Sequence, residues 1–298
     1  MTRRLHELRG PDVVPALGPH SVLVQPVGAI EQHGPHLPLS TDLLIAETLC
    51  ERVVAERGDE LDLWLLPPLA YTKSDEHAWS PGTVWLSATT MLAVLDDLGR
   101  SLAGLPTKRL AFVNGHGGNS ALLAVANREL RRHHGLMTFL LHPRQPPATT
   151  PAARVGGTDG PTDAAAGGGD TTDARAGTGG SPGGADAAVV DELGMGIHGG
   201  RDETSMVLHL RPDLVDMSLA VRAVPEGIAD RAHVRFGGDV AFGWCSDDLS
   251  PPGAVGDPTL ASADLGRELV DGAVSSLGDA LGEVATFAFP VAPGDGPT

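Results

Sequence analysis

The sequence predicts an α/β fold in which helices cover both faces of a parallel sheet. Short apolar segments of the kind that form buried strands alternate with longer segments whose apolar residues recur at helical spacing. This alternation is typical of parallel sheets. The chain has 298 residues, of which 41% are hydrophobic and 20% are charged. Such a length and composition suit a soluble domain with a sizeable core.

The first strand, helix and second strand are predicted close to the N-terminus. Residues 21–27 (SVLVQPV) form a short apolar segment that ends at Gly28, and we expect a buried strand there. Apolar residues recur at helical spacing over residues 41–57, and Gly58 is expected to stop that helix. Residues 61–66 are predicted to form the next strand, which two prolines halt.

Two further helix–strand pairs follow. The spacing of apolar residues predicts helices over residues 89–105 and 120–134. Strands are predicted over residues 108–113 (KRLAFV) and 136–141. The strand at 108–113 runs directly into a glycine-rich loop at 114–119.

The pattern of strands and helices breaks between residues 145 and 190. This stretch contains no Leu, Ile, Met, Phe, Tyr or Trp, and it cannot bury enough apolar surface to offset the entropy lost on ordering. We expect a disordered insertion inside a single domain that spans residues 1–298. Helices are predicted again at 202–210 and 262–281, and residues 290–298 are expected to form a loose tail.

Net charge and cysteine content restrict the class of protein. The chain carries 38 acidic and 21 basic residues, for a formal net charge of −17, so phosphate backbones and anionic membranes are expected to be repelled. The two cysteines cannot build a disulfide framework. No segment has the apolar length of a membrane span or the pattern of a signal peptide. We therefore expect a cytoplasmic protein without nucleic-acid or membrane partners.

The most informative motif lies at residues 28–42 (GAIEQHGPHLPLSTD), directly after the first strand. Open α/β sheets bind ligands at this edge. The segment contains Glu31, His33 and Asp42. Two carboxylates and a neutral imidazole nitrogen form a mixed oxygen and nitrogen ligand set, which suits Zn²⁺, Mn²⁺ or Fe²⁺.

Two more loops carry histidine or acidic residues. Residues 114–119 (NGHGGN) place His116 among glycines, which let the backbone approach a metal or an oxyanion closely. Residues 194–205 place His198 and Glu203 where a loop enters a helix. Each motif has a plain alternative: a surface Glu-x-His pair, a tight turn, or a first-turn acid favoured by the helix dipole. Together they favour a site, because each lies in a loop beside a predicted core element.

Taken together, these segments resemble the creatininase family, also called creatinine amidohydrolase-like proteins. The likeness covers about residues 20–142 and 194–285. The matching segments are EQHGPHLPLSTD at 31–42, NGHGGN at 114–119, HGGRDETS at 198–205 and, more weakly, SDEHAWSPGT at 74–83 and AVGDP at 254–258.

The resemblance implies a three-layer α/β/α sandwich around a mostly parallel central sheet, usually assembled as a homohexamer. It also implies two divalent metal ions (Zn, Mn or Fe) per subunit. Glu31 and His116 would hold one ion, His33 and a further acid would hold the other, and Asp42 would bridge both.

The identity of the further acid separates this chain from creatininase proper. There the acid lies two residues after the histidine of the glycine-rich loop, and here that position is Gly118. Family members with HGGN in this loop use the glutamate of the ETS motif, which is Glu203. The resemblance also matches His198 to the histidine proposed to carry a proton, so His198 and Glu203 are the expected catalytic residues.

A two-metal site would polarise an amide carbonyl and activate water at neutral pH. The backbone amides of Gly117 and Gly118 are expected to stabilise the oxyanion. His77 and Trp79 are expected to line the substrate pocket, with a loop histidine beside a packed tryptophan as the plain alternative. His36 is expected either to hydrogen-bond a metal-binding carboxylate or simply to cap its loop.

The resulting prediction is a metal-dependent amidohydrolase that cleaves a carbon–nitrogen bond in a cyclic amide, a formamide or a peptide. Gly118 argues against creatinine itself and favours enzymes that deformylate or open cyclic amides of nucleotide-derived compounds, or the mycofactocin precursor peptidase. That peptidase usually carries a HAGxTETS-like third motif, whereas this chain has HGGRDETS.

Two rival functions are weaker. A phosphate-binding hydrolase would need a basic residue near the loop at 114–119, and none follows it. A non-catalytic binding or scaffold protein on the same fold would need a lost ligand, whereas all five expected ligands are present.

Overall fold

A four-stranded parallel sheet with the strand order β2-β1-β3-β4 organises the chain. The computed structural model describes residues 2–143 and 192–290. The predicted insertion at 145–190 and all but the first residue of the predicted tail lie outside these residues. The strands are β1 (Val22–Val27), β2 (Leu63–Leu65), β3 (Arg109–Asn114) and β4 (Met137–Leu141).

The central strands are fully buried, which is why their sequences are nearly continuous apolar runs. Val22 of β1 pairs with Leu63 on one side and with Arg109 on the other, and Arg109 pairs with Met137 of β4. All these pairs are parallel, so the carboxyl ends of the strands, and the loops that follow them, meet at one edge of the sheet.

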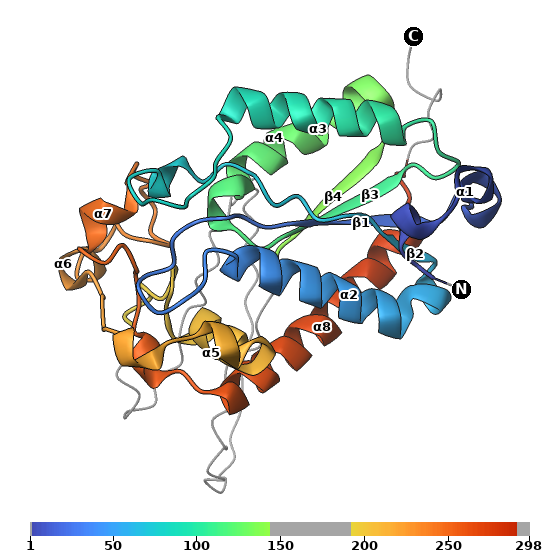
Figure 1. The fold of residues 1–298 in the computed structure, drawn as a ribbon. Helices are drawn as coiled ribbons and strands as arrows, with labels where there is room; N and C mark the ends of the chain where they lie inside the picture. Colours follow the sequence, from blue (N-terminus) through green and yellow to red (C-terminus); the bar gives the residue numbers. More distant parts are fainter. Residues whose placement is uncertain (1, 144–191, 291–298) are drawn as a thin grey trace, which may run out of the picture.

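Helices cover both faces of the sheet, as predicted (Figure 1). One layer contains α3 (Ala88–Leu102) and α4 (Ser120–His134), and the other contains α2 (Thr41–Leu61) and α8 (Ala263–Thr286), against which α5 (Arg201–Leu210) packs. The three-layer α/β class is therefore confirmed. Shorter helices are α1 (Gly10–Ala16), α6 (Glu226–Ala229) and α7 (Ser246–Leu249), with single 3₁₀ turns at Leu5–Glu7, Asp75–His77, Gly117–Asn119, Pro212–Leu214, Met217–Leu219 and Pro258–Leu260.

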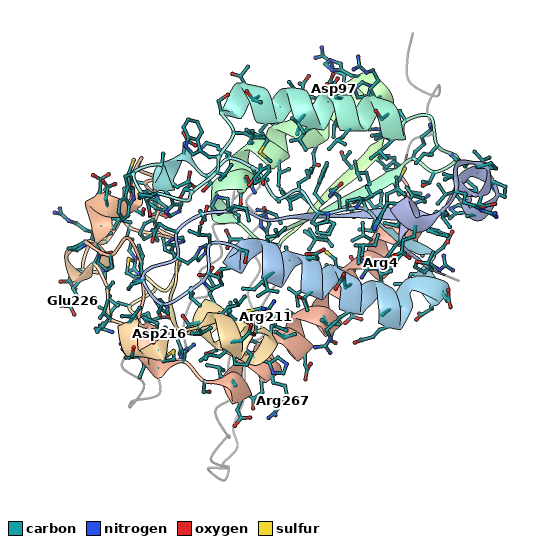
Figure 2. All side chains as sticks on the ribbon, viewed as in Figure 1. Arg4, Asp97, Arg211, Asp216, Glu226 and Arg267 are labelled. Carbon is teal, nitrogen blue, oxygen red and sulfur yellow. The ribbon has the colours of Figure 1, made fainter. Side chains whose placement is uncertain are left out.

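Alternation along β1 divides the core into two halves. Val22 and Val24 pack with Leu49 of α2 and Val270 of α8 in one cluster. Leu23 packs with residues of α3 and α4 in the other. Charged side chains lie outside both clusters, such as those labelled on α3 and α8 in Figure 2. Within the described ranges, no helix combines the length and apolarity that a membrane span needs.

The end of α2 differs from the prediction. Gly58 does not stop the helix, which continues to Leu61 and shortens the following strand to Leu63–Leu65. Asp62 ends it in a left-handed conformation, with φ of 52°, and its N–H bonds to the carbonyl of Gly58. One interior glycine costs about 1 kcal/mol, and the ion pairs that Arg3 makes with Asp59 and Asp62 help to hold the last turn.

Candidate metal centre

Three segments bring the predicted ligands together at the carboxyl edge of the sheet. Glu31, His33 and Asp42 come from the connection between β1 and α2, His116 follows β3, and Glu203 lies in the first turn of α5. The first four side chains are at most 6% exposed. The side chain of Glu203 is 24% exposed.

Glycines allow these segments to approach closely. Gly34 turns the chain after His33 with a φ of +76°. A Cβ on Gly115 would lie 3.0 Å from the carbonyl oxygen of Asp42, and a Cβ on Gly199 would lie 2.8 Å from that of His33. Side chains at these positions would push the segments apart, so the glycines set the size of the cluster.

The ligands form two groups that share Asp42. In one group, Asp42 Oδ2 lies 3.0 Å from His116 Nδ1, and Glu31 Oε2 lies 3.3 Å from His116 Nε2. In the other, His33 Nε2 lies 3.1 Å from Asp42 Oδ1 and 3.9 Å from Glu203 Oε2. Asp42 thus presents one oxygen to each group, which is what a bridging carboxylate requires.

Two buried carboxylate oxygens, Glu31 Oε1 and Asp42 Oδ2, have no hydrogen-bond partner among the described residues. A buried acceptor without a partner is costly, and more so when it is charged. Cations held by the two groups would supply both oxygens with a partner. The cluster therefore fits a pair of divalent ions, and its oxygen and nitrogen donors suit Zn²⁺, Mn²⁺ or Fe²⁺.

Burial and neighbouring charges set the protonation states of the residues in the cluster. Burial raises the pKa of Glu31 to about 8 and that of Glu203 to about 7. Burial by itself would lower the pKa of His33, but the carboxylates of Asp42, Glu203 and Glu31 together outweigh it and raise that pKa to about 10. The pKa of His116 is also raised, since Glu31 and Asp42 overcome the effect of burial. The cluster without a cation therefore holds protons that metal binding must displace.

His77 and His198 lie stacked against each other, with ring centroids 4.1 Å apart. Burial lowers the pKa of His77 to about 3 and that of His198 well below its ordinary value. His198 Nε2 lies 2.6 Å from the carbonyl oxygen of Gln32, which places the proton of the neutral ring on Nε2. Its Nδ1 faces Glu31 Oε1 at 3.6 Å, and Glu31, His33 and His198 make a third possible ligand group.

The remaining predicted residues lie around this cluster. His77 is buried and its Nε2 lies 3.4 Å from Glu31 Oε1, so it packs beneath the cluster rather than on an open surface. Trp79 is 42% exposed, and its Nε1 donates to Ser246 Oγ at 2.7 Å. His36 Nε2 lies 2.9 Å from the hydroxyl of Thr204, next to Glu203. Gly117 is exposed and Gly118 is half-buried.

Sequence reasoning missed several polar contacts of the cluster. The Ser74 hydroxyl donates to Glu31 Oε2, and Glu76 Oε1 lies 3.3 Å from His116 Nε2. Ser246 Oγ lies 2.9 Å from His77 Nδ1 although the two residues are 169 positions apart. The polar segment SDEH at 74–77 could have predicted the contacts of Ser74 and Glu76, whereas no motif around Ser246 predicts its contact with His77.

Glu192 braces the loop that carries His198. Its carboxylate accepts the backbone N–H of Arg201 at 2.9 Å and that of Asp257 at 2.6 Å. Cβ atoms on Gly196, Gly200 or Gly256 would lie within 2.7 Å of this carboxylate. The three glycines therefore leave space for the Glu192 carboxylate, and its hydrogen bonds hold the loop that leads into α5.

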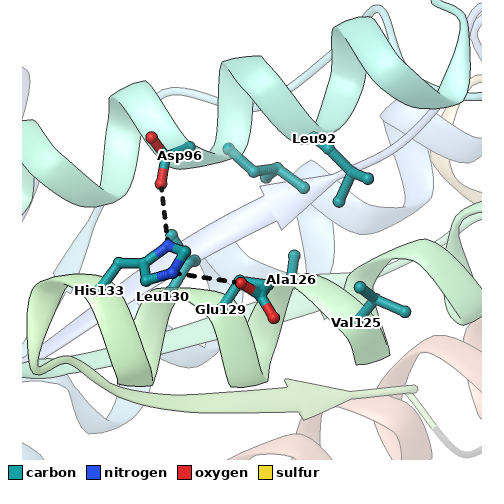
Figure 3. A pocket seen from close by; sticks show the side chains of 8 residues that line it. Leu92, Asp96, Val125, Ala126, Glu129, Leu130 and His133 are labelled. Atoms are coloured by element: carbon teal, nitrogen blue, oxygen red, sulfur yellow. Dashed lines mark ion pairs between the residues drawn. The ribbon is translucent and has the colours of Figure 1, made fainter.

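A separate surface groove lies between α3 and α4, away from the cluster (Figure 3). Its volume is about 270 Å³ and its lining is mostly aliphatic. His133 in this groove pairs with Glu129 at 3.4 Å and with Asp96 at 4.0 Å. The lining contains none of the predicted site residues.

Comparison with known proteins gives consistent matches over most of the chain. The family model described as creatininase, creatinine amidohydrolase, matches residues 6–281. A mycofactocin precursor peptide peptidase of Mycobacterium ulcerans is 35% identical over 269 residues, which cover 86% of this chain and 84% of the relative. A creatinine amidohydrolase of Pseudomonas putida is 29% identical over 278 residues, which cover 88% and 89%. Among solved structures, a mutant creatininase matches with a TM-score of 0.65 and 25% identity, over 96% of this chain and 99% of that chain.

Proposed function

The chain belongs to the creatininase family of hydrolases that act on carbon–nitrogen amide bonds, and from this premise we propose that it is a metal-dependent amidohydrolase with two divalent ions per subunit. The observation that carries the proposal is Asp42, whose two oxygens face two different ligand groups. We propose Glu31 and His116 as further ligands of one ion, and His33 and Glu203 as further ligands of the other.

When bound, such ions polarise an amide carbonyl and lower the pKa of water to near neutrality. The protein supplies the proton transfers and part of the oxyanion stabilisation. His198 keeps a lone pair on Nδ1 that faces the cluster, because Nε2 is directed at the Gln32 carbonyl. We propose that this lone pair takes up the proton released by the attacking water and that His198 then passes that proton to the leaving amine. Burial raises the pKa of Glu203 to about 7 in the metal-free protein, so as a metal ligand this group would have to give up its proton and bind as the carboxylate.

We propose a peptide as the substrate class. Two features support a peptide over creatinine: the 35% identity with a mycofactocin precursor peptide peptidase, and Gly118, which takes the place of the acid found in creatininase proper. The exposed backbone of Gly117 can offer an N–H to a substrate carbonyl. Trp79, which is partly exposed near the cluster, is assigned to the wall of the substrate site.

Metal content per subunit tests the proposal first. Protein purified without chelator or added metal is expected to carry close to two equivalents of Zn, Mn or Fe, and Asp42→Ala is expected to lose both. Asp96→Ala, in the groove between α3 and α4, serves as the control and should keep the metal. Less than half an equivalent in the unmodified protein, not restored by added metal, would refute the two-metal site.

Substrate class is tested on the same preparations. Mass spectrometry of short peptides should detect cleavage that depends on metal and on Asp42, with creatinine as the comparison substrate. Turnover of creatinine alone would overturn the peptide assignment and leave the amidohydrolase intact. The homohexamer and the cytoplasmic location also remain proposals, which light scattering and cell fractionation would test.

A further inference from the structure

We propose that Glu76 is a positioning residue that orients His116 as a metal ligand through Nδ1, and that Gly118 provides the space for this contact. The inference rests on the two-metal site proposed above. Glu76 is not one of the proposed ligands, and it lies in a fourth segment of the chain.

Glu76 reaches the centre from the 3₁₀ turn at Asp75–His77. Its side chain is only 11% exposed, and its Oε1 lies 3.3 Å from His116 Nε2. Its other oxygen lies 3.3 Å from Lys73 Nζ, which fixes the rotation of the carboxylate. A nearly buried acid held at both oxygens is a rigid contact.

The two ring nitrogens of His116 have different surroundings. Nε2 faces three acceptors, namely the carbonyl of Lys73 at 2.9 Å, Glu76 Oε1 and Glu31 Oε2. Nδ1 faces Asp42 Oδ2 at 3.0 Å, while the other oxygen of Asp42 faces His33. With a metal bound, the neutral ring would therefore keep its proton on Nε2 and direct the lone pair of Nδ1 to the side of the shared carboxylate. A carboxylate behind a metal-binding histidine fixes ring orientation and tautomer in this way.

Gly118 makes the contact possible. A Cβ on this residue would lie 2.0 Å from Glu76 Oε1 and 2.5 Å from His116 Nε2. Any side chain at position 118 must displace the carboxylate or the ring. Creatininase proper has an acid at the position of Gly118. In this chain the space beside Gly118 is filled by the Glu76 carboxylate, which contacts the His116 ring at Nε2.

The test is a metal titration of the full-length protein after removal of metal with a chelator. Co²⁺ is the probe, because its visible absorption reports the ligands directly, and Zn²⁺ competition gives the affinity. Glu76→Ala is expected to weaken metal binding by about 10–100-fold. Glu76→Gln keeps the shape of the side chain and one acceptor oxygen, so it should retain part of the metal affinity that Glu76→Ala loses. Asp75→Ala removes the neighbouring acid, which also pairs with Lys73, and should bind like the unmodified protein.

The nitrogen that binds the metal gives a second, independent readout. Side-chain ¹⁵N spectra of the Zn-loaded protein should show His116 bound through Nδ1 with a proton on Nε2. Binding through Nε2, or equal affinities of Glu76→Ala and the unmodified protein, would overturn the role of Glu76 while the two-metal site stands. Failure of the unmodified protein to bind Co²⁺ or Zn²⁺ would overturn both proposals.

Discussion

Replacing Gly266 by alanine is expected to damage the fold and the metal centre together. Gly266 lies on the face of α8 that packs against α5, and a Cβ there would lie 1.8 Å from the carbonyl oxygen of Ser205. Ser205 lies in the middle of α5, and its hydroxyl accepts the N–H of Ser262 at 3.1 Å. The overlap can be relieved only by moving one helix away from the other, and a shift of α5 would carry Glu203 in its first turn away from the metal centre.

The size of the effect follows from two opposing contributions. Alanine is favoured over glycine inside a helix by about 0.5–1 kcal/mol. Overpacking a tightly packed contact costs about 1–3 kcal/mol, and occasionally more. Gly282 offers a matched control on the same helix, because the nearest atom to its Cβ is 4.0 Å away. Gly282→Ala should therefore stabilise the protein by up to about 1 kcal/mol.

Urea unfolding of both variants, followed by circular dichroism, measures the free energy of unfolding at comparable m-values. Gly266→Ala should be less stable than the unmodified protein and should also bind less metal at the site that uses Glu203. If it proved as stable as Gly282→Ala, with the metal content unchanged, the close approach of α5 and α8 would be refuted.

Three further perturbations test other parts of the structure. Burial lowers the pKa of His36 to about 4, below the ordinary value of the unfolded chain. The unfolded chain therefore binds more protons than the folded protein between about pH 7 and pH 4. Acidification over this range should destabilise the unmodified protein by about 3 kcal/mol more than it destabilises His36→Gln. Parallel pH profiles of unfolding free energy for the two proteins would contradict this. His198→Ala should lower kcat by about 100-fold or more and keep both metal ions; full turnover would remove its role as proton donor, and loss of an ion would make it a ligand instead. Glu192→Ala leaves the backbone N–H groups of Arg201 and Asp257 without this acceptor and should cost about 1–3 kcal/mol in urea unfolding, so an unchanged midpoint would count against its bracing role.

The predictions from sequence succeeded where the signal is local. Apolar spacing located the helix at 120–134 with its observed bounds, and the buried run at 21–27 located β1 to within one residue. The end of α2 was wrong, because Gly58 was given more weight than the side chains that continue the helix. A single glycine is a weak stop when the following residues can still pair and pack.

Long-range contacts explain what the sequence did not predict. No element was predicted between residues 211 and 261, where the structure has short turns and the helices α6 and α7. This region is held by contacts such as that of Ser246 with His77, which leave no periodic trace in the sequence. Histidines and acids gather in three motifs, and the resemblance to the creatininase family singled out five of them as ligand candidates. The contact between Glu76 and His116 could not, because it depends on the space that Gly118 leaves in three dimensions.

A purely structural role does not account for the buried cluster. Glu31, His33 and Asp42 are almost completely buried at the end of a core strand, and two of their carboxylate oxygens find no hydrogen-bond partner in the described part of the chain. Replacing buried ion pairs with well-packed apolar residues is often neutral or stabilising, so a chain under selection for stability alone gains nothing from this arrangement. Each of these oxygens faces a histidine nitrogen that could serve as a ligand: Glu31 Oε1 faces His33 Nε2, and Asp42 Oδ2 faces His116 Nδ1. The proposed binding of cations would give a favourable partner to each of these groups, and it would explain why the fold accepts their cost at this edge of the sheet.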